Sequence, residues 1–220
     1  MVFNVVRPAT PPLSLASRQS YASEDVLIML KDIFFNKCYL CECKEPHDIN
    51  IEHFRPHKNN EDLKFDWKNL FYVCSRCNNI KLDSFDNILD CTDQDIDVFE
   101  RIKLLPPRTP NAELVLVEAI CIDERTKQTV ELLNKIYNEP TTVNKAITAA
   151  HLRKKVFKAY NRLLELMNIY FSDEESPERK SDALSRMREL MKRHQEFSAF
   201  LRWLILEDKV LSTLLRPEID

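Results

Sequence analysis

Four of the seven cysteines in this 220-residue chain form two C-x-x-C pairs. Cys38 pairs with Cys41 and Cys74 pairs with Cys77, with 32 residues between the two pairs. Structural zinc sites commonly take four thiolates from two such pairs and hold the ion in a tetrahedron. Four buried reduced cysteines are the alternative, because free cysteine is among the most buried residue types. The paired spacing favours a structural Zn²⁺ bound by all four.

The other three cysteines lie outside this pattern. Cys43 could replace Cys41 as a ligand or bind nothing, and Cys91 and Cys121 are isolated and expected in the core.

Polar residues between and beside the cysteines have the types that phosphodiester hydrolysis needs. That reaction requires a base to activate water and a cation to stabilise charge on the phosphorane and the leaving oxygen. His53 suits the first role, since an unperturbed imidazole has a pKa near ~6.5. Glu52 and Asn78 offer oxygen ligands that suit Mg²⁺ or Mn²⁺. Arg55 could hold a phosphate in a bidentate manner.

Geometry restricts how Glu52 and His53 can cooperate. Adjacent residues of a strand point to opposite faces, so the two share a site only where the strand ends or bends. A bend at Arg55-Pro56 would allow this. By residue type alone, a His next to a Glu is more often a surface or core pair than a catalytic one.

The elements that must position these residues can be read from the pattern of apolar side chains. Ser23 to Asn36 is predicted to be a helix that delivers the chain into Cys38. A strand is expected from Asp48 to Phe54 and a second from Leu70 to Val73, with a polar loop over 57–66 between them. A helix should then run from Ser75 to about Leu89.

The second half reads as mainly helical. Residues 90–110 are predicted to form an irregular connector closed by prolines, and 113–122 a strand. Asp123 and the Ser176-Pro177-Glu178 run are helix-start signals. Helices are expected at about 124–138, 142–171, 177–193 and 195–214.

Composition describes an ordinary globular protein, with 44% hydrophobic and 30% charged residues. The net charge of −3 does not advertise nucleic-acid binding, so any basic surface must be local. Residues 141–195 carry a local excess of basic side chains, which fits either a solvated helix face or a track for a phosphate backbone. No apolar run reaches the ~20 residues of a membrane span, and the N-terminus lacks a secretory pattern. We therefore expect a cytoplasmic protein with reduced thiols and no membrane partner.

Three runs of sequence carry a more specific resemblance. C-Y-L-C-E, I-E-H-F-R-P and W-K-N-L-F-Y-V-C-S-R-C-N-N-I-K together resemble the HNH endonuclease family. The resemblance implies a ββα-metal fold holding one catalytic divalent ion. It assigns His53 as general base, Asn69 as the residue that orders the loop between the strands, and Glu52 and Asn78 as metal ligands. Lys81 matches a lysine common in the family, and is expected with Arg55 to bind substrate.

Within that family, the E-H-F-R-P form, the W-x-N-L segment and the long helical part are similar to the PtuB group of the Septu anti-phage systems, including retron-associated versions. This resemblance implies an effector nuclease that works with an ATPase of the PtuA type. It also implies nucleic acid as substrate, with DNA favoured and RNA such as tRNA as the alternative. In retron-associated systems the reverse transcriptase and its nucleic acid would be further partners.

A rival interpretation is a zinc-stabilised module that binds nucleic acid or a partner and whose catalytic centre has decayed. Two departures from the family keep it open: the chain has no glycine, and Asn78 stands where a stronger His ligand can occur.

The predicted fold class is α+β, with a small zinc-stabilised ββα-metal core and a mainly α-helical C-terminal region. The expected organisation is an extended arm and lead helix over 1–37 and the nuclease core over 38–91. A connector, one strand and the helical region are expected over 92–220.

Overall fold

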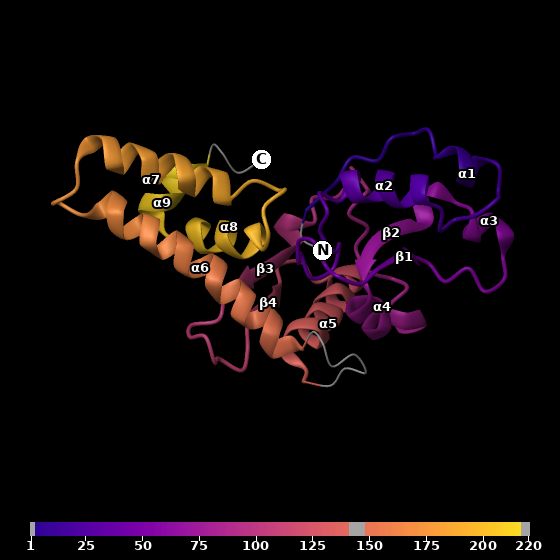
Figure 1. Cartoon of the computed structure of the whole chain (residues 1–220). Coiled ribbons are helices and arrows are strands. Elements are labelled where there is room, and N and C mark those ends of the chain that lie inside the picture. The colour runs from indigo at the N-terminus through magenta and orange to yellow at the C-terminus, as the bar shows by residue number, and fades with distance from the viewer. Residues whose placement is uncertain (1–2, 141–147, 217–220) are drawn as a thin grey trace.

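A short hairpin with its following helix lies at one end of the molecule, and long helices build the other end (Figure 1). The computed structural model describes residues 3–140 and 148–216. The N-terminal part contains α1 (Leu13–Ala16), α2 (Glu24–Ile33), β1 (Ile49–His53), α3 (Glu61–Lys64), β2 (Leu70–Cys74) and α4 (Ser75–Lys81). The remainder contains β3 (Ile102–Leu105), β4 (Leu116–Ala119), α5 (Glu124–Asn138), α6 (Ala149–Phe171), α7 (Pro177–Leu190), α8 (Ser198–Glu207) and α9 (Lys209–Leu215). The fold is therefore a mixture of helices with small two-stranded sheets.

The strands β1 and β2 form an antiparallel hairpin in which Ile49 lies opposite Cys74 and His53 lies opposite Leu70. β2 runs directly into α4, so the predicted order of strand, loop, strand and helix is observed. Two details differ from the prediction. The expected loop contains α3, whose first amides are capped by the Asn60 side chain. The helix α4 ends at Lys81, well short of Leu89, because Leu82 takes a positive φ of 44°.

A second hairpin pairs β3 with β4 in antiparallel register. The sequence predicts one strand in this region and an irregular connector before it, so β3 is a correction. Its four residues are too few to show a clear alternation, and prolines follow it directly. Ile102 and Leu104 are fully buried, and α8 packs against this strand.

The helix α5 has the predicted bounds, and the Asp123 side chain accepts a hydrogen bond from the Thr126 amide. The helix α7 begins as predicted, capped by Ser176. The prediction for 142–147 lies outside the described residues, and α6 begins at Ala149. The single helix expected over 195–214 is two helices. Asp208 separates them because its side chain caps the Val210 and Leu211 amides and starts α9.

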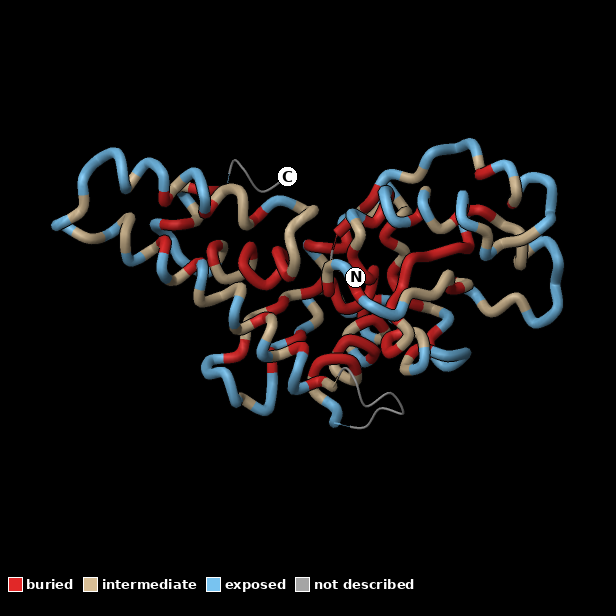
Figure 2. The backbone as a smooth tube through the Cα atoms, in the orientation of Figure 1, coloured by how far each residue is buried: buried red, intermediate tan, exposed pale blue. Residues whose placement is uncertain are grey.

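One hydrophobic core joins the N-terminal part to β3, β4, α5 and the first turns of α6 and α8, and buried segments run through the centre of the molecule (Figure 2). The N-terminal arm contributes Phe3 and Val5 to this core, whereas Val6 between Val5 and Arg7 is 75% exposed. Arg7 lies 4.7 Å above the ring of Trp67, and its guanidinium donates to the Trp67 and Leu70 carbonyls. These contacts fasten the arm to β2. A second cluster of buried side chains lies among α6, α7, α8 and α9.

Among the described residues, no helix has the length and apolar character that crossing a bilayer requires.

Candidate functional site

The four paired cysteines meet in one buried cluster. The chain turns so that the Cys38 amide bonds the Cys43 carbonyl, which forms the first knuckle. Cys74 ends β2 and Cys77 lies in the first turn of α4, which forms the second. All four sulfur atoms lie within 4.8 Å of one another, and those of Cys41 and Cys74 are 3.9 Å apart.

These distances suit a tetrahedral metal. With Zn–S bonds of ~2.3 Å, thiolates at the corners of a tetrahedron lie about 3.8 Å apart. Hydrogen bonds from the neighbouring thiols, Cys38 first, hold the pKa of Cys74 far below its usual range. The same group of thiols raises the pKa of Cys41, and burial raises that of Cys77. A cation at the centre would deprotonate all four. The cluster could bind a structural metal such as zinc.

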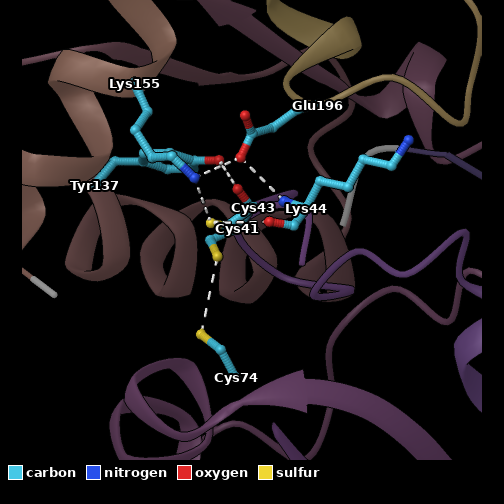
Figure 3. A network of polar contacts seen from close by, with 7 residues as sticks. All are labelled: Cys41, Cys43, Lys44, Cys74, Tyr137, Lys155 and Glu196. Carbon is cyan, nitrogen blue, oxygen red and sulfur yellow. Dashed lines mark hydrogen bonds and ion pairs between the residues drawn. The ribbon is translucent and has the colours of Figure 1, made fainter. Parts of the chain in front are cut away.

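Residues of the helical half of the chain contact the first knuckle through hydrogen bonds and an ion pair (Figure 3). The Tyr137 hydroxyl donates to the Cys41 carbonyl at 2.7 Å. Lys155 lies 2.7 Å from a Glu196 carboxylate oxygen, which also accepts from the Lys44 amide at 3.0 Å. The Lys155 ammonium reaches Cys43 as well, 3.0 Å from its sulfur.

The remaining cysteines lie apart from the four-cysteine cluster. Cys43 contacts Lys155 instead, and burial raises the pKa of its thiol to about 11. Cys91 is buried as expected, whereas Cys121 is half-buried.

A polar cleft of about 440 Å³ opens where the end of β1 meets α4. It brings together four residues that the sequence predicts to be functional: Glu52, His53, Asn78 and Lys81. The other residues that line it come mainly from the loop between the strands and from the end of α4. They are Tyr21, Ile51, Pro56, His57, Lys58, Asn59, Leu82 and Asp83.

His53 is held in one orientation at the end of β1. Its Nε2 lies 3.0 Å from the Lys64 carbonyl oxygen. A carbonyl can only accept, so this bond assigns the hydrogen to Nε2 and leaves the Nδ1 lone pair of the neutral ring available. Burial lowers the pKa of His53, although the bond to Lys64 acts in the opposite direction. The ring is therefore neutral at pH 7 and can accept a proton.

Glu52 precedes His53 on β1 and is buried, with 5% of its surface exposed. Its Oε1 accepts from the Tyr39 hydroxyl at 2.8 Å and lies 2.7 Å from the Lys81 ammonium. Its Oε2 is buried without a hydrogen-bond partner among the described residues. Burial raises the pKa of this carboxyl to about 7, while Lys81 and Tyr39 lower it. A carboxylate oxygen without a hydrogen-bond partner, on a residue that lines a polar cleft, is a suitable ligand for a hard cation.

Lys81 was expected to contact substrate, but its side chain is buried and occupied. Besides Glu52, it donates to the Phe54 carbonyl at 2.9 Å. The sequence pattern gave no sign of this pairing, because Glu52 and Lys81 belong to different elements.

Asn69 and Arg55 do not line the cleft. Asn69 is buried. Its side-chain Oδ1 accepts from the Arg55 N–H at 2.8 Å, and its Nδ2 donates to the Arg55 and Leu63 carbonyls at 2.9 Å each. These three bonds tie the start of the intervening loop and α3 to the residue that precedes β2. Arg55 is exposed to solvent. Asn78 is half-buried on α4 and reaches the cleft.

Two tyrosines of the site carry no signal in the sequence. Tyr39 lies between the first two cysteines and binds Glu52, and Tyr21 comes from the segment before α2 and contacts the His53 ring edge-on at 4.7 Å. Neither has a spacing that would mark it.

Comparison with known proteins gives a partial match. The chain is 36% identical over 59 residues to the Septu protein PtuB of Bacillus thuringiensis. The aligned segment covers 26% of this chain and 23% of that relative, so the chain matches about a quarter of the relative's length. No protein-family model matches the chain.

Proposed function

We propose that this chain is a metal-dependent nuclease of the HNH type and the effector of a Septu-like anti-phage system. The partial similarity to PtuB suggests the defence role. One observation carries the nuclease assignment. His53 lines a polar cleft, and the hydrogen bond from its Nε2 to the Lys64 carbonyl fixes the orientation of its ring.

The chemistry follows from that setting. The Nδ1 lone pair of His53 takes a proton from a water molecule, whose oxygen forms a bond to phosphorus. The bond between phosphorus and the leaving oxygen breaks in the same displacement. Because its pKa is lowered by burial, His53 begins this step unprotonated at neutral pH.

Glu52 and Asn78 would hold the catalytic Mg²⁺ or Mn²⁺. Both line the cleft, and Glu52 has an unpartnered carboxylate oxygen. When bound, such an ion supplies positive charge that stabilises the developing phosphorane and leaving oxygen. Asn69 supports the site from outside the cleft, since it holds the loop that carries Arg55, which would bind substrate phosphate.

The four cysteines would hold structural zinc. That ion would join the segment before β1 to the end of β2, and so set the hairpin that carries His53. In a core this small, metal binding contributes directly to folding.

The proposed partners are nucleic acid and a PtuA-type ATPase, in the cytoplasm. The net charge of −3 is consistent with part of the nucleic-acid surface being supplied by the ATPase. DNA is the favoured substrate and RNA the alternative, and a retron reverse transcriptase with its nucleic acid would join in retron-associated systems.

The test is a cleavage assay on plasmid DNA and on cellular RNA, with Mg²⁺ or Mn²⁺, with and without the ATPase. His53→Ala should abolish cleavage while folding and partner binding persist. His151→Ala is the matched control, because His151 is exposed on α6 and far from the cleft in sequence. Unchanged cutting by pure His53→Ala protein would refute the assigned base.

One observation favours a second candidate, a zinc-stabilised binding module without activity. The Lys81 ammonium already neutralises Glu52, one of the two proposed ligands for the catalytic ion. This candidate would be supported if the protein protected nucleic acid without cutting it under all of the conditions above.

A further inference from the structure

The loop between the two strands holds a second histidine in a defined state. The Asn59 amide lies 3.3 Å from Nδ1 of His57. A backbone N–H can only donate, so Nδ1 accepts, and the neutral ring carries its hydrogen on Nε2. Among the described residues no hydrogen bond engages that Nε2–H. His57 therefore presents a donor, on a residue that lines the cleft.

The turn that produces this state is an unusual one. Lys58 and Asn59 both have positive φ, at 44° and 66°, a region that is uncommon for residues with a Cβ and is tolerated better by Asn than by Lys. The Asn60 amide closes the turn by donating to the His57 carbonyl at 2.6 Å. Strained turns of this kind persist where the surrounding structure determines them, and they are concentrated at functional sites.

His57 and His53 offer complementary groups. Their ring centroids lie 4.6 Å apart with planes at 61°. In His53 the Nε2–H is used by Lys64, which leaves a lone pair on Nδ1. In His57 the Nδ1 lone pair is used by Asn59, which leaves an N–H on Nε2. One cleft thus holds a proton acceptor and a hydrogen-bond donor side by side.

We propose that His57 is a further catalytic residue, whose Nε2–H donates a hydrogen bond to a non-bridging oxygen of the scissile phosphate. The inference rests on the proposed nuclease function. Hydrolysis places extra negative charge on those oxygens in the transition state, and a donor fixed beforehand stabilises it without reorganisation. His57 keeps its proton throughout: the proton leaves water for His53, and the bond that breaks joins phosphorus to the leaving oxygen.

The same geometry argues against a metal-ligand role for His57. Metal binding needs a nitrogen lone pair. The lone pair on Nδ1 is engaged by Asn59, and Nε2 carries hydrogen. The two possible roles of His57, hydrogen-bond donor and metal ligand, therefore predict different dependences of the cleavage rate on metal concentration, and a metal titration distinguishes them.

The experiment compares the wild type with His57→Ala, His57→Gln and the control His47→Ala in single-turnover cleavage across a Mn²⁺ titration. His47 is exposed and does not line the cleft. We expect His57→Ala to cut about 10²- to 10³-fold more slowly at saturating Mn²⁺, with an unchanged Mn²⁺ midpoint. His57→Gln, which retains an N–H donor, should recover part of the rate, and His47→Ala should match the wild type.

Three results would overturn the assignment of His57 while the proposed nuclease function stands. A tenfold shift of the Mn²⁺ midpoint in His57→Ala would make His57 a ligand, and a rate within twofold of the wild type would remove any catalytic role. A two-bond ¹⁵N–¹H spectrum that shows the hydrogen on Nδ1 would contradict the assigned state without any activity measurement. If instead the wild type and every variant fail to cut while the spectrum shows Nε2–H, the proposed function falls, and the catalytic role of His57 falls with it. Zinc content and melting temperature, measured for each variant, separate loss of rate from loss of folding.

Discussion

The ammonium of Lys81 lies 2.7 Å from a carboxylate oxygen of Glu52, and both side chains are almost fully buried. The pair joins β1 to the end of α4 and forms one wall of the cleft. Lys81 also donates to the Phe54 carbonyl, and Tyr39 donates to Glu52, so three elements of the core meet at this carboxylate.

Removal of one partner should be costly, because it leaves the other charge buried and unpaired. We expect Lys81→Met to lower the free energy of unfolding by about 3–5 kcal/mol. The control is Lys64→Met, which breaks an ion pair of 2.9 Å with Glu61 whose side chain is 58% exposed. That change should cost less than about 1 kcal/mol. Urea denaturation of both variants provides the comparison, and equal losses would show that burial of the pair contributes nothing.

The cysteine cluster should bind zinc tightly. Metal analysis of dialysed protein is expected to find about one zinc per chain. Cys77→Ser should lose the metal and unfold at a lower temperature, because it removes one of four ligands. Cys121 lies outside the cluster, so Cys121→Ser should retain the zinc and the melting temperature of the wild type. Folded protein without metal would contradict the site.

Asn69 should be important for stability through its three hydrogen bonds. Asn69→Ala leaves the Arg55 N–H and two carbonyls without their partner, so we expect a loss of about 2–4 kcal/mol. Asn50→Ala removes a single bond to Ser75 on the partly exposed side of β1 and should cost about 1 kcal/mol. Thermal unfolding in excess zinc measures both changes. A loss for Asn69→Ala no larger than the control would contradict its role in holding the loop.

The pH dependence of cleavage should change with metal concentration. The pKa of Glu52 is raised to about 7, so this ligand protonates as pH falls through that value. The pKa of His53 is lowered from 6.5, so the base stays unprotonated to a lower pH. At limiting Mg²⁺ we expect the cleavage rate to decrease as the pH drops below about 7, the pKa of Glu52. At saturating Mg²⁺ the fall should move below pH 6.5. If the pH–rate profiles at the two Mg²⁺ concentrations coincide, Glu52 is not a ligand of the catalytic ion.

The contacts that Lys155 of α6 and Glu196, just before α8, make with the first knuckle should slow the loss of metal. Glu196 accepts from the Lys44 amide and pairs with Lys155 (Figure 3). We expect Glu196→Ala to release zinc to a chelator several-fold faster, because the knuckle loses this support. The control is Glu131→Ala, which breaks a surface pair with Lys135 on α5. Equal release rates in the two variants would show that this support does not hold the knuckle.

Local patterns in the sequence determined much of what the structure shows. The two C-x-x-C pairs predicted a four-cysteine cluster, since such pairs need only one chain reversal to face each other. Apolar spacing located both strands around the cleft and the bounds of α5. Capping residues such as Asp123 and Ser176 marked helix starts because they act on amides only two or three residues away.

The tertiary structure alone decided which side chains meet. The pairing of Glu52 with Lys81 and Tyr39 joins residues from three elements, and no spacing rule relates them. The strand β3 exists because β4 lies beside it, and its four residues carry too little pattern to be found alone. The states of His53 and His57 depend on a carbonyl and an amide that the folded loop brings to them. Sequence supplies the chemical types, but distances and dielectric environment, which set pairing and pKa, arise only when distant segments pack together.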